Sequence, residues 1–321
     1  MKLLFITANR IGDAVLSTGI LASLLESYPT ARVTIAVGPA AASLFRAVPA
    51  VEHIIVVNKL PLGLHWAGLW RATAGTRWDI VVDLRRSAIA WTLRAGKRCI
   101  IPKRAEQMHR VRLLATTIGA DDNPPNPKLW ADKKDESTAA RLIPNGVPVL
   151  ALAPAANWRG KQWDAANFSQ LSERLTAKDG ILAGARIAIL AAAQERAQTE
   201  QVLQSVPRDR LINLVGKADL ATISACLKRC QFFVGNDSGL SHMAAAAGVP
   251  TLSLFGPSRP ELYAPWGNNT TWVRTIETYD ELIGVPNYDH RTTGSMMNSL
   301  TVEMVEEAAI ALWRRTQAAA T

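Results

Sequence analysis

The sequence has little of what builds several common kinds of site. It has three cysteines, too few for a disulfide framework and with no further ligands nearby for a metal site. They are Cys99, Cys226 and Cys230, which we interpret as buried thiols in a reducing compartment. No run approaches the roughly 18 uninterrupted apolar residues that a membrane-spanning helix needs. The apolar start of the chain is broken by Arg10 and Asp13, which is typical of a first β-strand rather than a signal peptide. We therefore expect a cytoplasmic protein.

Glycine-rich nucleotide motifs are also missing. The turn after the first expected strand reads TANRIGD, which lacks the G-x-G-x-x-G pattern of nicotinamide-dependent oxidoreductases. The sequence contains no Walker loop, zinc-binding spacing or nucleophile elbow. These absences argue against nicotinamide-dependent enzymes, P-loop enzymes and zinc hydrolases.

Acidic residues are scarce in the first half, which holds the whole net charge of +9. Residues 1–146 carry 20 Lys and Arg against 11 Asp and Glu, whereas residues 147–321 carry 16 of each. Nine bases lie between Arg85 and Arg112, with Glu106 as the one acid among them. This asymmetry indicates either an anionic partner, such as a nucleic acid, membrane surface or phosphorylated substrate, or a solvated basic face.

Short β-rich runs alternate with helical patterns along the chain, which predicts parallel sheets covered by helices on both faces. A polar, proline-rich stretch between Gly119 and Pro148 interrupts the alternation, and a short helix is expected within it near residues 136–141. We predict two Rossmann-like α/β domains, residues 1–146 and 147–321, facing a cleft. The C-terminal run TVEMVEEAAIALWRRT predicts an amphipathic helix, expected to pack back towards the first domain.

The stretch QFFVGNDSGLSHMAAAAGVPTLSLFG predicts a strand, a turn and a helix. Ligands of open α/β sheets bind at the carboxyl ends of strands, and the free N–H groups of Ser238, Gly239 and Leu240 would suit a phosphate. Asp237 would either contact a sugar hydroxyl or cap the helix. His242 would either face the ligand or pack in the core.

Two further residues are candidates for chemistry. Lys161 follows the expected strand 151–153 and would either neutralise a diphosphate or lie in solvent. Asp13 would either cap a helix over residues 14–28 or act as a general base. The run LPLGLHWAGLW, residues 60–70, is either an exposed apolar loop that touches a membrane or, more usually, a helix packed into a core.

The sequence resembles the bacterial ADP-heptose:lipopolysaccharide heptosyltransferases (glycosyltransferase family 9) along essentially its whole length. The likeness is carried by IGDAVLSTGILASLLESYPTARVTIAVG, RWDIVVDLRRS, GKQWDAANFSQL and, most specifically, VGNDSGLSHMAAAAGVPTLSLFGPSRPELYAPWG. The resemblance implies a GT-B fold, in which the first domain binds the acceptor and the second binds the nucleotide-sugar donor. It also implies inverting chemistry without a metal or cofactor.

The resemblance assigns roles to individual residues. Asp13 matches the catalytic base, and Lys161 matches the lysine on the donor diphosphate. The donor motif matches Asp237, Ser238, Gly239, Leu240 and His242. Ala156 and Asn157 stand where the family has hydroxyl residues near the phosphates, and Glu195 matches a glutamate that touches the ribose, although Ala192–Ala193 replaces the usual Gly-Gly before it.

From these residues we expect heptose transfer from ADP-heptose to an anionic inner-core lipopolysaccharide acceptor. The enzyme would rest on the cytoplasmic face of the inner membrane and would not bind nucleic acid. The alternatives are a GT-B enzyme with another nucleotide sugar or acceptor, a sugar-nucleotide epimerase, and a catalytically idle binding protein for nucleotide sugar or lipopolysaccharide.

Overall fold

A computed structural model describes residues 1–103, 107–285, 288–289 and 291–319. Arg104 and Glu106 of the basic cluster lie outside these ranges. The chain divides into two compact units, Met1–Asp132 and Lys133–Thr321. The division comes before the predicted boundary at residue 146, because helix α5 (Lys133–Leu142) packs on α8 (Leu220–Leu227) through a buried hydrogen bond of 2.7 Å from Thr222 Oγ1 to Asp135 Oδ1.

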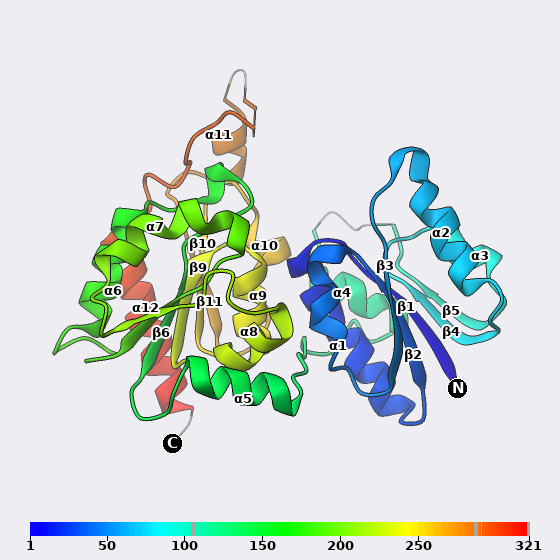
Figure 1. The fold of residues 1–321 in the computed structure, drawn as a ribbon. Helices are drawn as coiled ribbons and strands as arrows, with labels where there is room; N and C mark the ends of the chain where they lie inside the picture. The colour runs from blue at the N-terminus through cyan, green and yellow to red at the C-terminus, as the bar shows by residue number, and fades with distance from the viewer. Residues whose placement is uncertain (104–106, 286–287, 290, 320–321) are drawn as a thin grey trace. The chain divides into compact units, whose positions relative to one another are not determined.

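The first unit contains a five-stranded sheet in the order β3-β2-β1-β4-β5, in which all neighbouring strands are parallel. Helices α1 and α4 cover one face, and α2 and α3 cover the other (Figure 1). The strands are β1 (Lys2–Ile6), β2 (Arg32–Val37), β3 (Val51–Val56), β4 (Trp78–Asp83) and β5 (Ala95–Ile100). The helical elements are α1 (Ile11–Ser27), η1 (Pro39–Phe45), η2 (Pro61–Gly63), α2 (Leu64–Thr73), α3 (Ile89–Thr92), α4 (Arg110–Ala115) and η3 (Thr116–Ile118).

The second unit contains a six-stranded parallel sheet in the order β11-β10-β9-β6-β7-β8. The strands are β6 (Val149–Ala153), β7 (Arg186–Ile189), β8 (Leu211–Asn213), β9 (Phe232–Asn236), β10 (Thr251–Phe255) and β11 (Thr270–Arg274). The other helical elements are η4 (Arg159–Lys161), α6 (Ala165–Thr176), η5 (Ala193–Glu195), α7 (Arg196–Ser205), α9 (Gly239–Ala246), α10 (Pro260–Tyr263), α11 (Tyr279–Ile283) and α12 (Val302–Ala318).

Each sheet has a topological switch point. Counted from the first strand of its own unit, the second sheet has the order 3-2-1-4-5-6, which is the Rossmann arrangement, and the first sheet has the order 3-2-1-4-5. The switch lies between β1 and β4 in the first unit and between β6 and β9 in the second. Ligands of such sheets bind beyond the carboxyl ends of these strand pairs.

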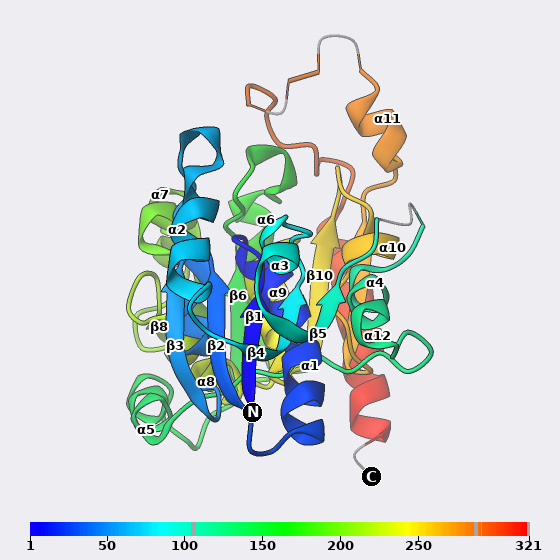
Figure 2. The same cartoon turned by 90° about the vertical axis from the view of Figure 1, so that its right-hand side faces the viewer.

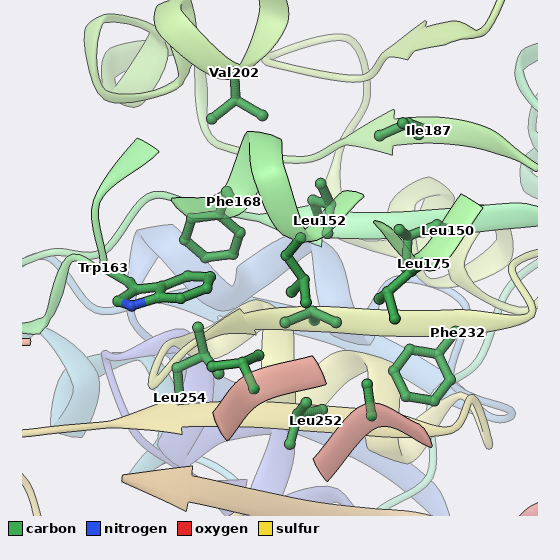
Figure 3. Close-up of a cluster of buried hydrophobic side chains, with 14 of the residues drawn as sticks. Leu150, Leu152, Trp163, Phe168, Leu175, Ile187, Val202, Phe232, Leu252 and Leu254 are labelled. Atoms are coloured by element: carbon green, nitrogen blue, oxygen red, sulfur yellow. The ribbon is translucent and has the colours of Figure 1, made fainter. Parts of the chain in front are cut away.

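The core of the second unit lies between its sheet and helices α6, α7 and α12 (Figure 3). Phe168 of α6 and Phe232 of β9 are fully buried, and the indole of Trp163 meets the Phe168 ring edge to face at 5.1 Å. Val305, Ala309 and Leu312 place the buried side of α12 in this same core. The apolar side of α12 therefore packs within the second unit. The expected packing of this helix towards the first domain stays a prediction.

Figure 2 shows α2 and α3 of the first unit from the side, with the strands behind them. The predicted helix in the run 60–70 is present, but only Leu69 and Thr73 of α2 are buried.

Within the described ranges, no helix is both long enough and apolar enough to cross a membrane.

Candidate functional site

The junction between β9 and α9 holds the predicted motif at the switch point of the second sheet. The strand ends at Asn236, and the helix begins at Gly239 with Ser238 as its N-cap residue. Asp237 does not cap this helix, which overturns the capping alternative. Its backbone N–H instead donates to Leu254 O on β10 at 3.0 Å.

Lys161 and Asp237 meet as an ion pair, with 2.5 Å between Nζ and Oδ2. The two side chains are 21% and 9% exposed. They come from loops that follow β6 and β9, which are adjacent strands of the sheet. Because an ammonium group has three donors, Lys161 can hold Asp237 and still bind a second anion. The pair also reduces the repulsion between Asp237 and a phosphate.

Ser238 supplies the observation that points most directly to a ligand. Its Oγ is buried, and among the residues that the structure describes it has no hydrogen-bond partner. A buried hydroxyl without a partner costs free energy, so this atom is suited to a ligand oxygen. It stands at the N-terminus of α9, where the helix dipole and free N–H groups favour an anion.

Asn236 fixes the loop that carries Lys161, a role that sequence reasoning missed. Its fully buried side chain donates to Pro154 O at 2.7 Å and accepts from Trp163 N at 3.2 Å. Trp163 in turn donates its indole N–H to Leu300 O at 2.7 Å. A buried amide directly after a hydrophobic strand was the available signal, since such a group must find partners.

The segment before α12 also holds the loop of Lys161. Met296 N donates to Gly160 O at 3.0 Å, and Ser295 Oγ donates to Gln162 O at 2.6 Å. A side chain at Gly160 would meet the Trp158 ring, since an added Cβ would lie 2.7 Å from Cζ2. Glycine is therefore required for this close approach.

The remaining predicted donor residues are His242, Asn157 and Glu195. His242 is buried on α9, at 6% exposure, so it is packed rather than open to solvent. Asn157 is exposed on the loop after β6, beside the buried Ala156, whose N–H donates to Gln198 Oε1 at 3.2 Å. Glu195 is half-buried, and its Oε2 accepts from Ala192 N at 2.9 Å, so one carboxylate oxygen is already used by the backbone.

Asp13 lies in the first turn of α1, which begins at Ile11 with Arg10 as its N-cap residue. The predicted capping role for Asp13 is therefore wrong, because the helix starts earlier than the sequence suggested. Asp13 Oδ1 is 3.4 Å from Arg110 Nε, and the two side chains are 28% and 21% exposed.

A cavity of about 390 Å³ opens beside Asp13 at the carboxyl ends of β1, β4 and β5. We call it the basic cavity. Its described lining includes four arginines and one carboxylate: Arg10, Arg85, Arg86, Arg110 and Asp13. The arginines were not singled out from the sequence, although the density of bases between residues 85 and 112 was a signal for three of the four.

Arg85 is held in the basic cavity from several sides. Its guanidinium donates to Asn9 Oδ1 at 2.7 Å and lies 4.8 Å from the centre of the Trp66 ring. Burial lowers its pKa, and the charge of Asp83 opposes that shift. Asp83 is fully buried at the end of β4, and its carboxylate accepts from Arg85 N at 2.9 Å and from the N–H and hydroxyl of Ser87 at 2.7 Å. Burial raises the pKa of Asp83, and the Ser87 hydroxyl opposes this.

Residues 71–282 match the family Glycosyltransferase family 9 (heptosyltransferase). The chain belongs to glycosyltransferase family 9. The match includes β4 and β5 of the first unit and both residues of the Lys161–Asp237 pair, but it begins after Asp13. Membership makes the chain a glycosyltransferase, and it confirms the resemblance read from the sequence.

Curated relatives agree with this family. Lipooligosaccharide heptosyltransferase 2 of Haemophilus influenzae is 32% identical over an alignment that covers 44% of this chain and 40% of that protein. Lipopolysaccharide heptosyltransferase 2 of Salmonella typhimurium is 24% identical, with 88% of this chain and 90% of that protein covered.

Solved structures show the fold. Escherichia coli ADP-heptose lps heptosyltransferase II superimposes with a TM-score of 0.75 at 20% identity, covering 99% of this chain and 100% of that one. E. coli heptosyltransferase WaaC with ADP gives a TM-score of 0.71 at 18% identity, with 97% and 100% covered. These likenesses, together with the two parallel sheets, confirm the predicted GT-B class with two Rossmann-like domains.

Proposed function

We propose that this chain is an inverting heptosyltransferase that transfers heptose from ADP-heptose to an anionic inner-core lipopolysaccharide acceptor. The observation that carries the proposal is the junction at Ser238. A buried hydroxyl that has no partner in the described part of the chain stands there at a helix N-terminus, next in sequence to the Lys161–Asp237 pair. The names of the relatives, lipopolysaccharide heptosyltransferases, and the ADP in a solved structure with the same fold support the choice of substrates.

The second unit would bind the donor. The diphosphate would accept hydrogen bonds from the Ser238 hydroxyl and from the backbone N–H groups of Ser238, Gly239 and Leu240. Lys161 would bind it with the donors that Asp237 leaves unused. Asp237 would accept a hydrogen bond from a sugar hydroxyl, and His242, which is buried on α9, would help to orient the donor.

Two outer residues complete the proposed donor site. Asn157 would contact the phosphates from the loop after β6. Glu195 would contact the ribose with the carboxylate oxygen that does not bind Ala192 N. Glu195 therefore has only one carboxylate oxygen to recognise a ribose. For this reason a transferase that uses another nucleotide sugar remains the alternative.

The first unit would bind the acceptor in the basic cavity. Arginines bind carboxylates and phosphates through paired N–H donors, so four of them suit an acidic sugar or a phosphorylated one. Asp13, whose carboxylate is oriented by Arg110, would accept the proton of the attacking hydroxyl.

The proposed reaction is a single displacement at the anomeric carbon. The acceptor oxygen forms a bond to the anomeric carbon on the face opposite the nucleotide, while the bond from that carbon to the diphosphate oxygen breaks and its electron pair leaves with ADP. The proton of the acceptor goes to Asp13, and the configuration at carbon is inverted. Lys161 and the helix N–H groups would stabilise the charge that develops on the diphosphate, which is the task a metal ion performs in other transferases.

An acceptor of this class is anchored in a membrane by its lipid. We therefore propose peripheral association of the first unit with the cytoplasmic face of the inner membrane. The surplus of basic residues in this unit favours an anionic lipid surface.

The test is release of ADP from ADP-heptose with and without lipopolysaccharide acceptor. We expect release only with acceptor. Asp13→Asn should reduce transfer about 100-fold or more while ADP still binds, because the base is lost and the shape is kept. Asp122→Asn, which changes an exposed acid of the same unit, is the matched control.

Other outcomes would identify the alternatives. Donor binding without release would indicate a binding protein, and interconversion of free sugar nucleotide would indicate an epimerase. Release from a different nucleotide sugar alone would identify another GT-B transferase. Near-normal turnover by Asp13→Asn would refute the role of the base.

A further inference from the structure

An exposed apolar turn joins β3 to α2. We call residues 60–64, LPLGL, the leucine turn. Leu60, Leu62 and Leu64 are 48%, 98% and 57% exposed, and Leu62 is the most exposed large apolar side chain in the described part of the chain. Because three leucines in five residues are kept in water, the turn differs from the singly scattered apolar residues of an ordinary surface.

The backbone holds Leu62 outward in an unfavourable conformation. Leu62 has φ 53°, in the left-handed region that favours glycine or asparagine, and it stands between Pro61 and Gly63, which has φ 73°. Leu60 N donates to His65 Nδ1 at 3.3 Å, which ties the start of the turn to the first turn of α2. Because Leu62 is exposed, it adds no buried apolar surface to the core that would offset this backbone strain. We therefore infer that its side chain contacts a partner.

The base of the turn is connected to the basic cavity. All strands of the first sheet are parallel, so the turn after β3 lies at the same carboxyl edge as the cavity. Leu69 anchors α2 in the core. One turn earlier on the same helix, the ring of Trp66 packs against the Arg85 guanidinium. Arg85 lines the cavity next to Asp13. A surface that receives the leucine turn would therefore lie beside the cavity mouth.

The charges around the turn favour an anionic surface. The sequence from His53 to Trp78 contains no acidic residue, whereas Lys59, Arg71 and Arg77 are present and exposed. Trp70, 47% exposed on α2, adds an indole of the kind enriched at the interface between lipid and water.

We propose that the leucine turn inserts into an anionic phospholipid bilayer, with Lys59 and Arg71 at the headgroups. A projecting turn of three leucines is too small for a stable protein interface, which buries about 800 Å² per partner, but it suits insertion between lipids. The inference deepens the proposed function, on which its meaning rests: insertion would bring the basic cavity to the headgroup layer where a lipid-linked acceptor is exposed.

Flotation with vesicles tests the proposal in the absence of donor and acceptor. The full chain should float with vesicles that contain phosphatidylglycerol, and less with phosphatidylcholine alone. Binding should fall in about 1 M NaCl, where the Debye length is about 3 Å. Leu62→Asn should raise the apparent Kd about ten-fold, because the inserted side chain is lost.

The choice of asparagine keeps the experiment interpretable. Asparagine tolerates a positive φ, so the variant should fold at least as well as the wild type. Ile276→Asn is the matched control, since it removes an equally branched side chain, 77% exposed, from the second unit; its binding should equal that of the wild type. Wild-type protein that fails to float, or Leu62→Asn that floats equally well, would overturn the proposal.

A second assay separates this inference from the proposed function. Leu62→Asn should transfer heptose normally to a lipid-free acceptor oligosaccharide but poorly to acceptor embedded in vesicles. If wild-type protein floats through Leu62 but transfers to neither acceptor, the transferase proposal fails and the membrane surface stands. Equal loss on both acceptors would show that Leu62 acts on the cavity instead, which contradicts insertion.

Discussion

Removal of Lys161 should destabilise the second unit by leaving the Asp237 carboxylate without its ion-pair partner. The side chains are 21% and 9% exposed and 2.5 Å apart. Breaking a fully buried pair costs about 3–5 kcal/mol. Because water reaches part of Lys161, we expect Lys161→Met to lower the free energy of unfolding by about 2–3 kcal/mol.

A double-mutant cycle isolates the pair. In Lys161→Met/Asp237→Asn neither charge remains, so the combined loss should be smaller than the sum of the two single losses, with a coupling energy of about 1–2 kcal/mol. Urea unfolding of the four proteins measures it. Lys217→Met, an exposed lysine of the same unit, is the control and should be neutral within about 0.5 kcal/mol.

ADP titration of the same proteins tests the functional side. Lys161→Met should bind ADP more weakly, since the phosphates lose a cation. Asp237→Asn should bind ADP at least as well as the wild type, because a negative charge beside the phosphates is gone, while transfer falls. Additive stability losses, or unchanged ADP affinity in Lys161→Met, would refute the reasoning.

Three further changes probe other parts of the structure. Ser238→Ala should not lower stability, because the buried hydroxyl has no partner among the described residues, and it should weaken ADP binding about 5–10-fold by calorimetry, because the proposed hydrogen bond to the diphosphate is lost. Asp135→Ala should cost about 1–3 kcal/mol in urea unfolding, because Thr222 loses its buried acceptor. Burial raises the pKa of Cys226 to about 11, which keeps the neutral thiol and so should make its alkylation by iodoacetamide slow at pH 8 and faster as the pH approaches 11; rapid labelling of the folded protein at pH 8 would contradict this.

Much of the fold could be predicted from local sequence signals. The helix expected near residues 136–141 is α5, and the amphipathic helix predicted for the C-terminal run is α12. The exact domain division could not be predicted, because the polar composition of the linker does not reveal that Asp135 would be buried against Thr222.

The site was predictable in its parts but not in its connections. The motif indicated Asp13, Lys161 and Asp237 separately, and their roles in catalysis and binding stay predictions. That Lys161 pairs with Asp237 depends on the adjacency of β6 and β9, which a residue pattern cannot specify. Asn236 was missed for the same reason, since both its partners lie more than 70 positions away in sequence.

The loop of Lys161 has a consequence for the end of the chain. Its Trp163 indole is bound to Leu300, its Gly160 carbonyl accepts from Met296, and α12 begins immediately afterwards at Val302. The segment that leads into the C-terminal helix thus helps to hold the loop of Lys161, the residue that we propose binds the diphosphate. A tag, fusion or truncation that loosens α12 should therefore weaken ligand binding at a loop about 140 residues earlier in the sequence.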